Sequence, residues 1–123
     1  MNAWLAVVLG GFVGAPARYL VDRAVTLRVA GATPPREFPW GLLAVNVLGS
    51  IAAGLVLAWT TGDLRILLLA GFCGAFTTFS GFGWEAYRLW DASRRAFWAV
   101  VVVMPVACVA GFLIAWKLAG LTG

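Results

Sequence analysis

Four long apolar runs, separated by short polar segments, dominate the chain. Charged residues are absent from four stretches of 17, 25, 19 and 21 residues, which are Met1 to Ala17, Phe38 to Gly62, Ile66 to Trp84 and Ala96 to Trp116. A helix needs roughly 20 apolar residues to cross the hydrocarbon core of a bilayer, within a range of about 17–25. The pattern therefore predicts an all-α membrane protein whose four transmembrane helices cover about residues 3–21, 40–60, 65–87 and 96–117.

The composition favours a membrane protein over a soluble globule. Hydrophobic residues make up 63% of the 123 residues, charged residues make up 11%, and the mean hydropathy is +0.94. A soluble domain of ordinary composition is about 45–50% apolar and about 25% charged. Because the charge is too scarce to cover a globule in water, we expect one transmembrane domain over residues 1–123, in the cell membrane and surrounded by the lipid bilayer.

The basic residues are unevenly distributed between the two ends of the predicted helices. Two of them, Arg65 and Lys117, belong to one end, and seven belong to the other: Arg18, Arg23, Arg28, Arg36, Arg88, Arg94 and Arg95. The positive-inside rule then places the two longer connectors in the cytoplasm and both termini outside. The connector after the first span contains Thr33-Pro34-Pro35, which predicts a turn. The net charge of +4 comes from residues at the ends of apolar runs, so we expect no nucleic-acid partner.

Few side chains are suited to catalysis. The sequence has no histidine, and its two cysteines, Cys73 and Cys108, lie inside predicted spans without a spacing typical of a metal site or a disulfide. No nucleophile and base stand in a recognisable arrangement. We therefore expect neither an enzyme nor an organic cofactor.

A polar residue interrupts the second apolar run. Asn46 precedes a ridge of small residues, in which Gly49 and Ala53, and then Ser50 and Gly54, are four positions apart. Such ridges allow helices in membranes to pack closely. A buried amide without a partner costs about 1–3 kcal/mol. Asn46 is therefore either an interhelical hydrogen-bonding residue or an amide donor that lines a polar path, and the sequence leaves both interpretations open.

The third run combines glycines with hydroxyl residues in the middle of a span. Between Gly71 and Gly83 lie Gly74, Thr77, Thr78, Ser80 and Gly81. This composition predicts an interrupted helix, which is tolerated at that depth only where protein or a water-filled cavity surrounds the backbone. Carbonyl oxygens released at a break can coordinate a small cation without any carboxylate. Phe79 and Phe82 flank Ser80 and, at this spacing, lie on one helix face, where packing alone would also explain them.

Arg18 and Glu85 are the ionisable residues nearest the membrane interior. Ionisable residues in spans are functional candidates. An interfacial position, with the charged group extended toward water, explains each of them equally well.

Each of the first three spans contains one longer motif. The three motifs are residues 10–19 with Gly10-Gly11, Gly14 and Arg18-Tyr19, residues 41–54 with Asn46 and Gly49-Ser50, and residues 71–85 with Gly74, Thr77-Thr78-Phe79-Ser80, Phe82 and Glu85. In this order and spacing the chain resembles the CrcB/Fluc family of fluoride channels over essentially its whole length. The resemblance implies two four-helix subunits packed antiparallel in a dual-topology dimer, with two narrow pores that export fluoride passively.

The resemblance also implies roles for individual residues. Asn46, Phe79, Ser80 and Phe82 match the family's fluoride pore. The backbone carbonyls of Gly74 and Thr77 match a structural sodium site. Arg18 and Glu85 match charged residues of the vestibule or the subunit interface. The expected partners are therefore the fluoride ion, a sodium ion and a second homologous subunit.

Two features depart from the family pattern. Family members commonly carry threonine where this chain has Gly81, and tyrosine and serines along the fourth span, whereas residues 96–121 contain no Tyr, Ser or Thr. The basic bias also fixes one insertion orientation, and an antiparallel homodimer needs both. The chain is then either one half of a heterodimer with a homologous chain or a homodimer that overcomes its bias.

Two other functions compete with the fluoride channel. A small dual-topology multidrug exporter also has four spans, but it needs a carboxylate within the first span, and this chain has none before Asp22. A non-transporting membrane adaptor would explain the small-residue ridges and would leave the glycine-threonine-phenylalanine segment without a role.

Overall fold

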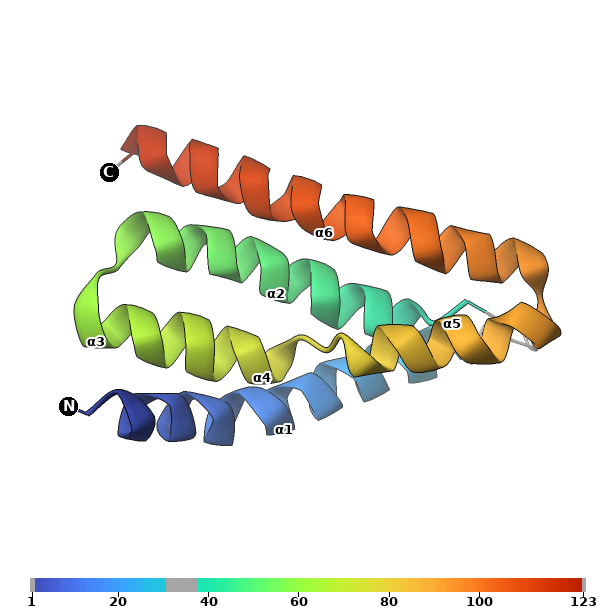
Figure 1. Cartoon of the computed structure of the whole chain (residues 1–123), viewed down its shortest axis with the longest axis horizontal. Helices are drawn as coiled ribbons and strands as arrows, with labels where there is room; N and C mark the ends of the chain where they lie inside the picture. Colours follow the sequence, from blue (N-terminus) through green and yellow to red (C-terminus); the bar gives the residue numbers. More distant parts are fainter. Residues whose placement is uncertain (1, 31–37, 123) are drawn as a thin grey trace.

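The computed structural model describes residues 2–30 and 38–122, which form long helices joined by short turns (Figure 1). In chain order the elements are α1 (Ala3–Ala30), α2 (Trp40–Trp59), α3 (Gly62–Arg65), the π-helical η1 (Ile66–Cys73), α4 (Gly74–Phe76), α5 (Ser80–Ala92) and α6 (Arg94–Thr122). Within the described residues, four helical stretches are long and apolar enough to cross a membrane: Ala3–Val29, Trp40–Trp59, Gly62–Ala92 and Arg94–Thr122. The predicted all-α fold with four membrane-spanning helices is confirmed.

The first helix is longer than the apolar run that predicts it. It continues through Asp22 and Arg23 to Ala30, because a charged residue ends a hydrophobic run without ending a helix. Side-chain bonding within the added turns supports the helix, since the Thr26 hydroxyl donates to the Asp22 carboxylate over 3.2 Å. The turn predicted at Thr33-Pro34-Pro35 lies outside the described residues.

The third span is interrupted where the sequence predicts it. The chain is helical from Gly62 through Phe76, turns extended at Thr77 with φ −87° and ψ 166°, and becomes helical again at Ser80. In Figure 1 this interruption is the irregular yellow link between α4 and α5. The break at residues 77–79 confirms the predicted discontinuity.

The segment before the break packs against α1 through glycines. A Cβ on Gly10 would lie 2.1 Å from the carbonyl oxygen of Leu67, and one on Gly71 would lie 2.9 Å from the Cα of Gly10. Real Cβ atoms do not approach backbone atoms so closely, so only glycine permits this contact. The pairing places η1 directly beside α1 and fixes where the break falls relative to the first span.

The segment after the break packs against α6 instead. A hydrophobic core joins α5 and α6 to the start of α2; its buried members are Leu42, Leu89, Ala96, Val100 and Met104. Phe82 is half-buried against this core. The third span therefore changes partners across its interruption, from α1 to α6.

The chain ends and the turns lie at the two ends of the bundle. The N-terminus, the turn from α2 to α3 and the end of α6 lie together at one end, and the turn from α5 to α6 lies at the other (Figure 1). Large apolar side chains are exposed along the outside of the helices, among them Trp4, Phe12, Val106 and Leu121. In water this surface would be unfavourable, whereas it matches the hydrocarbon of a bilayer.

Candidate functional site

A pair of hydrogen bonds joins α2 to the break. The Asn46 side chain accepts from the Thr78 N–H at 2.8 Å through Oδ1 and donates from Nδ2 to the Thr78 carbonyl oxygen over 3.1 Å. Asn46 is buried, with 6% of its surface exposed. The amide thus satisfies both backbone polar groups of one residue, Thr78, where the helix is interrupted. The interpretation of Asn46 as an interhelical hydrogen-bonding residue describes this contact.

The Thr78 side chain caps the start of α5, the helix that follows the break. Its Oγ1 accepts the N–H of Gly81 at 3.0 Å and lies 3.3 Å from the Ser80 hydroxyl. A hydroxyl that accepts an N–H in the first turn of a helix acts as an N-terminal cap. The sequence analysis missed Thr78, although its place in the Thr-Thr pair just before the break was the available signal.

These bonds redirect two backbone donors. In an unbroken α-helix the N–H of residue i+4 donates to the carbonyl of residue i. The Thr78 N–H would then donate to the Gly74 carbonyl, and the Gly81 N–H would donate to the Thr77 carbonyl. Here the Thr78 N–H donates to Asn46, and the Gly81 N–H donates to the hydroxyl of Thr78. The carbonyls of Gly74 and Thr77 are the two for which the sequence predicts a sodium site. Arg18 Nη1 lies 3.4 Å from the Thr77 oxygen.

Three cavities open around the break. A cavity of 380 Å³ between α2, the third span and α6 is lined by Gly74 and Thr77. A second cavity, of 270 Å³, is lined by Asn46, Phe79 and Phe82. Ser80 does not line either of them; it lines the third cavity, of 620 Å³. The structure therefore brings three of the four predicted pore residues to one cavity and places Ser80 next door.

The two phenylalanines lie side by side at the start of α5. Their ring centroids are 5.8 Å apart and their planes are inclined by 43°. Phe79 is 84% exposed, while Phe82 is half-buried on the core. Because an aromatic ring carries its positive potential at its edge, inclined rings at the mouth of a cavity can present C–H groups to an anion.

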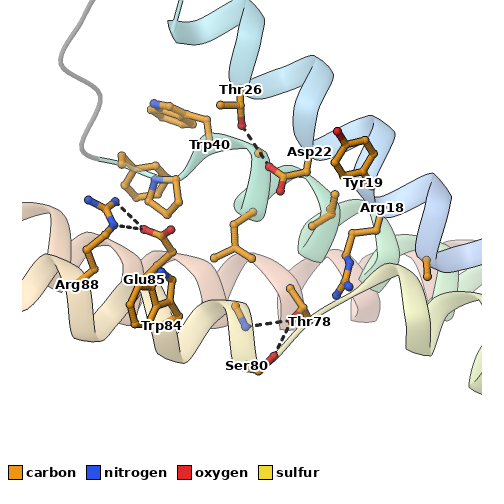
Figure 2. A pocket seen from close by; sticks show the side chains of 17 residues that line it. Arg18, Tyr19, Asp22, Thr26, Trp40, Thr78, Ser80, Trp84, Glu85 and Arg88 are labelled. Carbon is orange, nitrogen blue, oxygen red and sulfur yellow. Dashed lines mark hydrogen bonds and ion pairs between the residues drawn. The ribbon is translucent and has the colours of Figure 1, made fainter.

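Charged side chains line the 620 Å³ cavity (Figure 2). Arg18 from α1 and Glu85 from α5 both line it, together with Ser80 and Thr78. Arg88 Nη2 lies 2.6 Å from Glu85 Oε2, and Arg88 Nε donates to the same oxygen over 3.0 Å. Sequence reasoning found Arg18 and Glu85 and missed Arg88, although a spacing of three residues on a helix predicts such an ion pair.

The chain matches a known protein family over most of its length. The family described as "CrcB-like protein, Camphor Resistance (CrcB)" matches residues 5–120. The chain belongs to the CrcB family. With four apolar helices, this member of the family is a multi-pass protein of the cell membrane.

Curated relatives of this CrcB-family chain carry a consistent name. A protein of Nocardia farcinica, named fluoride-specific ion channel FluC 1, is 44% identical over 106 residues, which cover 85% of this chain and 71% of the relative. One of Geobacillus kaustophilus, with the same name, is 42% identical over 117 residues, covering 94% of both chains. One of Koribacter versatilis, named fluoride-specific ion channel FluC, is 38% identical over 120 residues, covering 92% of this chain and 91% of the relative.

The departure on the fourth span is visible at the site of this CrcB-family chain. The α6 residues that line the 270 Å³ cavity are Met104, Pro105 and Cys108. Met104 Sδ lies 3.5 Å from Asn46 Nδ2, and thioether sulfur is only a weak acceptor. The α6 wall of the cavity therefore carries sulfur atoms and a proline ring, and no hydroxyl group.

Proposed function

We propose that this chain is a subunit of a fluoride-selective channel that exports fluoride passively and so lowers its concentration in the cytoplasm. The observation that carries the proposal is the interrupted third span, which brings Asn46, Phe79 and Phe82 to one cavity. Family membership supports it, since the relatives are named fluoride-specific ion channels. A channel needs no catalytic residues, so the proposal agrees with the expectation that the chain is not an enzyme.

The proposed path uses weak and directed donors. Fluoride is small and strongly hydrated, so a dry path must replace its water. Ring edges of Phe79 and Phe82, and the hydroxyl of Ser80, supply positive potential along the proposed route. Asn46 lines the same path. Weak donors suit conduction because an ion that is bound too tightly does not leave.

A structural sodium ion is part of the proposal. The donor set suits a hard cation, since Gly74 and Thr77 line one cavity and the usual helical N–H donors of their carbonyls bond elsewhere. Hard cations take oxygen ligands, including backbone carbonyls. When bound, the ion supplies positive charge beside the anion path. The Thr77 carbonyl also accepts from the Arg18 guanidinium over 3.4 Å, so a bound ion would share this oxygen with a positively charged side chain.

We further propose that the conducting unit is an antiparallel dimer with a second homologous chain. The distribution of basic residues along the helices supports a separate partner chain. Arg28 lies in the last turn of α1, and Arg94 and Arg95 begin α6, at the end of the bundle opposite the α2–α3 turn. At that turn, the Arg65 guanidinium donates to the carbonyls of Thr60 and Leu57. One orientation is therefore favoured, and the opposite one has to come from another chain.

The competing functions gain no comparable support. A multidrug exporter would need a carboxylate deep inside the first span, whereas Asp22 comes after the charge-free run, in the later turns of α1, with its oxygen bonded by Thr26 beside the start of α2. An adaptor would not need the arrangement of rings and carbonyls at the break.

The function is tested by ion efflux from liposomes that contain the purified protein. We expect rapid fluoride release, measured with a fluoride electrode, and little chloride release from matched vesicles. Equal release of both ions, or no fluoride release from any assembly of this chain, would contradict the proposal.

The partner is tested by comparing the chain alone with the chain co-expressed with a homologue of opposite basic bias. We expect fluoride release only from the co-expressed pair. Strong release from the chain alone would show that it forms a homodimer, which would overturn the heterodimer proposal and leave the fluoride function intact.

A further inference from the structure

The Asn46 amide is fully engaged by neighbouring groups. Its oxygen accepts from the Thr78 N–H, and its nitrogen donates to the Thr78 carbonyl and approaches Met104 Sδ. A side-chain amide nitrogen carries two N–H groups. The Thr78 carbonyl accounts for one of them, and the weak thioether acceptor of Met104 accounts for the other. The buried Asn46 therefore has its hydrogen-bonding capacity committed to the protein before any ion arrives.

The Thr78 peptide is the point at which the helical pattern changes. Its N–H is the donor that an unbroken helix would direct to Gly74, and its side chain takes the N–H that would be directed to Thr77. Without these two bonds, the backbone could recover its energy by re-forming the regular i to i+4 pattern. Asn46 and Thr78 thus keep the helical N–H donors away from the two carbonyls that the proposed sodium site uses, of which that of Thr77 accepts from Arg18 instead.

The packing of α2 against the break reinforces this arrangement. Gly49 lies one turn after Asn46, and a Cβ there would be 2.2 Å from Thr77 Cγ2. The Ser50 hydroxyl donates to the Asn46 carbonyl over 2.7 Å, within α2 itself. The second span therefore meets both Thr77 and Thr78, one through close packing and the other through hydrogen bonds.

We propose that Asn46 and Thr78 are positioning residues for the cation site: Asn46 holds the Thr78 backbone out of the helical pattern, which keeps the helical N–H donors away from the Gly74 and Thr77 carbonyls that the ion would use. Asn46 then contributes to conduction by fixing the break. This inference deepens the proposed function and rests on the proposed sodium site. The hydrogen bonds of Asn46 and Thr78 do not themselves involve the ion, so they can be measured without sodium.

The first test is amide hydrogen exchange of the purified protein, which needs no sodium and no transport. In Asn46→Leu we expect the Thr78 amide to exchange about tenfold faster, since one net hydrogen bond is lost. In Thr78→Val, which keeps the branched shape, we expect the same change at Gly81 and an unchanged rate at residue 78. Thr60→Val is the matched control, because it removes a hydroxyl that donates to a carbonyl of α2, that of Val56, at the α2–α3 turn. Unchanged exchange at both positions would overturn the inference.

The second test is the sodium dependence of thermal unfolding, with N-methylglucamine replacing sodium. We expect the sodium concentration for half-maximal stabilisation to rise about tenfold in Asn46→Leu and in Thr78→Val, for the loss of one net hydrogen bond each. Thr60→Val should match the wild type. If Asn46→Leu does not fold, Thr78→Val carries the test alone.

The two proposals fail in different ways. A wild-type protein whose unfolding midpoint ignores sodium would contradict the sodium site. A wild-type protein that responds to sodium, with variants that respond at the same concentration, would contradict the positioning role and leave the sodium site standing.

Discussion

The third span has two segments, one on each side of the break, that meet their neighbours through different contacts. Before the break, η1 and α4 carry only apolar side chains and glycines, and η1 touches α1 almost backbone to backbone at Gly71 and Gly10. After the break, α5 carries Ser80, Glu85 and Arg88 along a cavity and packs on α6 through Leu89.

The difference shows how one span can serve both stability and transport. Contacts between backbones leave no room for adjustment, so the first segment is a fixed reference for the break. Contacts through side chains around cavities leave space for an ion. Under the proposed function, the first segment mainly stabilises the fold and the second mainly provides the path, and the following predictions test that division.

The largest effect on stability is expected at the contact of α1 with η1. Gly10→Ala would force a Cβ to within 2.1 Å of the Leu67 carbonyl oxygen, and overpacking of this kind costs about 1–3 kcal/mol or more. Thermal unfolding in detergent measures the loss. Gly11→Ala is the control, since its Cβ would have no atom closer than 3.9 Å. If both variants unfold alike, the first segment is not held by this contact.

A somewhat smaller effect is expected at the junction of the two segments. In Gly49→Ala the new Cβ would meet the Thr77 side chain at 2.2 Å, which can be displaced at a cost of about 1–2 kcal/mol. Because Thr77 borders the break, we expect fluoride flux to fall severalfold along with stability. Gly83→Ala, which has open space around it, should lose neither. Normal flux in Gly49→Ala would separate the break from the path.

The next effect concerns the start of the first segment. Arg65 binds the last carbonyls of α2, where a cation also favours the helix dipole. Arg65→Ala should lower stability by about 1–2 kcal/mol, as for hydrogen bonds to charged groups, with flux per folded channel unchanged. Unfolding and flux are measured on the same preparation. Lys117→Ala, at an exposed position on α6, is the control, and a drop in flux per folded channel would contradict the division.

The smallest effect on stability is expected in the second segment. Glu85→Gln removes one member of a partly exposed ion pair, which contributes about 0–1 kcal/mol. The flux should respond more, because the cavity loses a negative charge. We expect a rise of about two- to threefold at low ionic strength that disappears at high salt. Asp91→Asn, also exposed on α5 but not lining the cavity, should change nothing.

Much of this fold follows from the sequence by length and polarity alone. Four charge-free runs set the number of spans, and the glycines and threonines near Gly74 and Thr77 indicated the break. The end of α1 could not be read in the same way, because Asp22 stops the apolar run and still suits a helix whose next turns extend beyond it.

The details of the site depend on contacts that no local pattern contains. Asn46 and Thr78 are 32 positions apart, so their pairing appears only once α2 lies against the break. For the same reason the sequence could not tell that Ser80 lines a different cavity from Phe79 and Phe82. The roles assigned from the sequence stay predictions for all eight residues: Asn46, Phe79, Ser80, Phe82, Gly74, Thr77, Arg18 and Glu85.

The most direct measurement compares one substitution at two phenylalanines. Phe82→Ile removes a ring from the proposed path, whereas Phe12→Ile removes a ring that is 80% exposed on α1. In liposomes with the conducting channel, we expect Phe82→Ile to reduce the initial rate of fluoride release by at least about tenfold, which corresponds to about 1.4 kcal/mol in the barrier. Phe12→Ile should release fluoride at the wild-type rate. Equal release by all three proteins would contradict a path along the ring edges at the break.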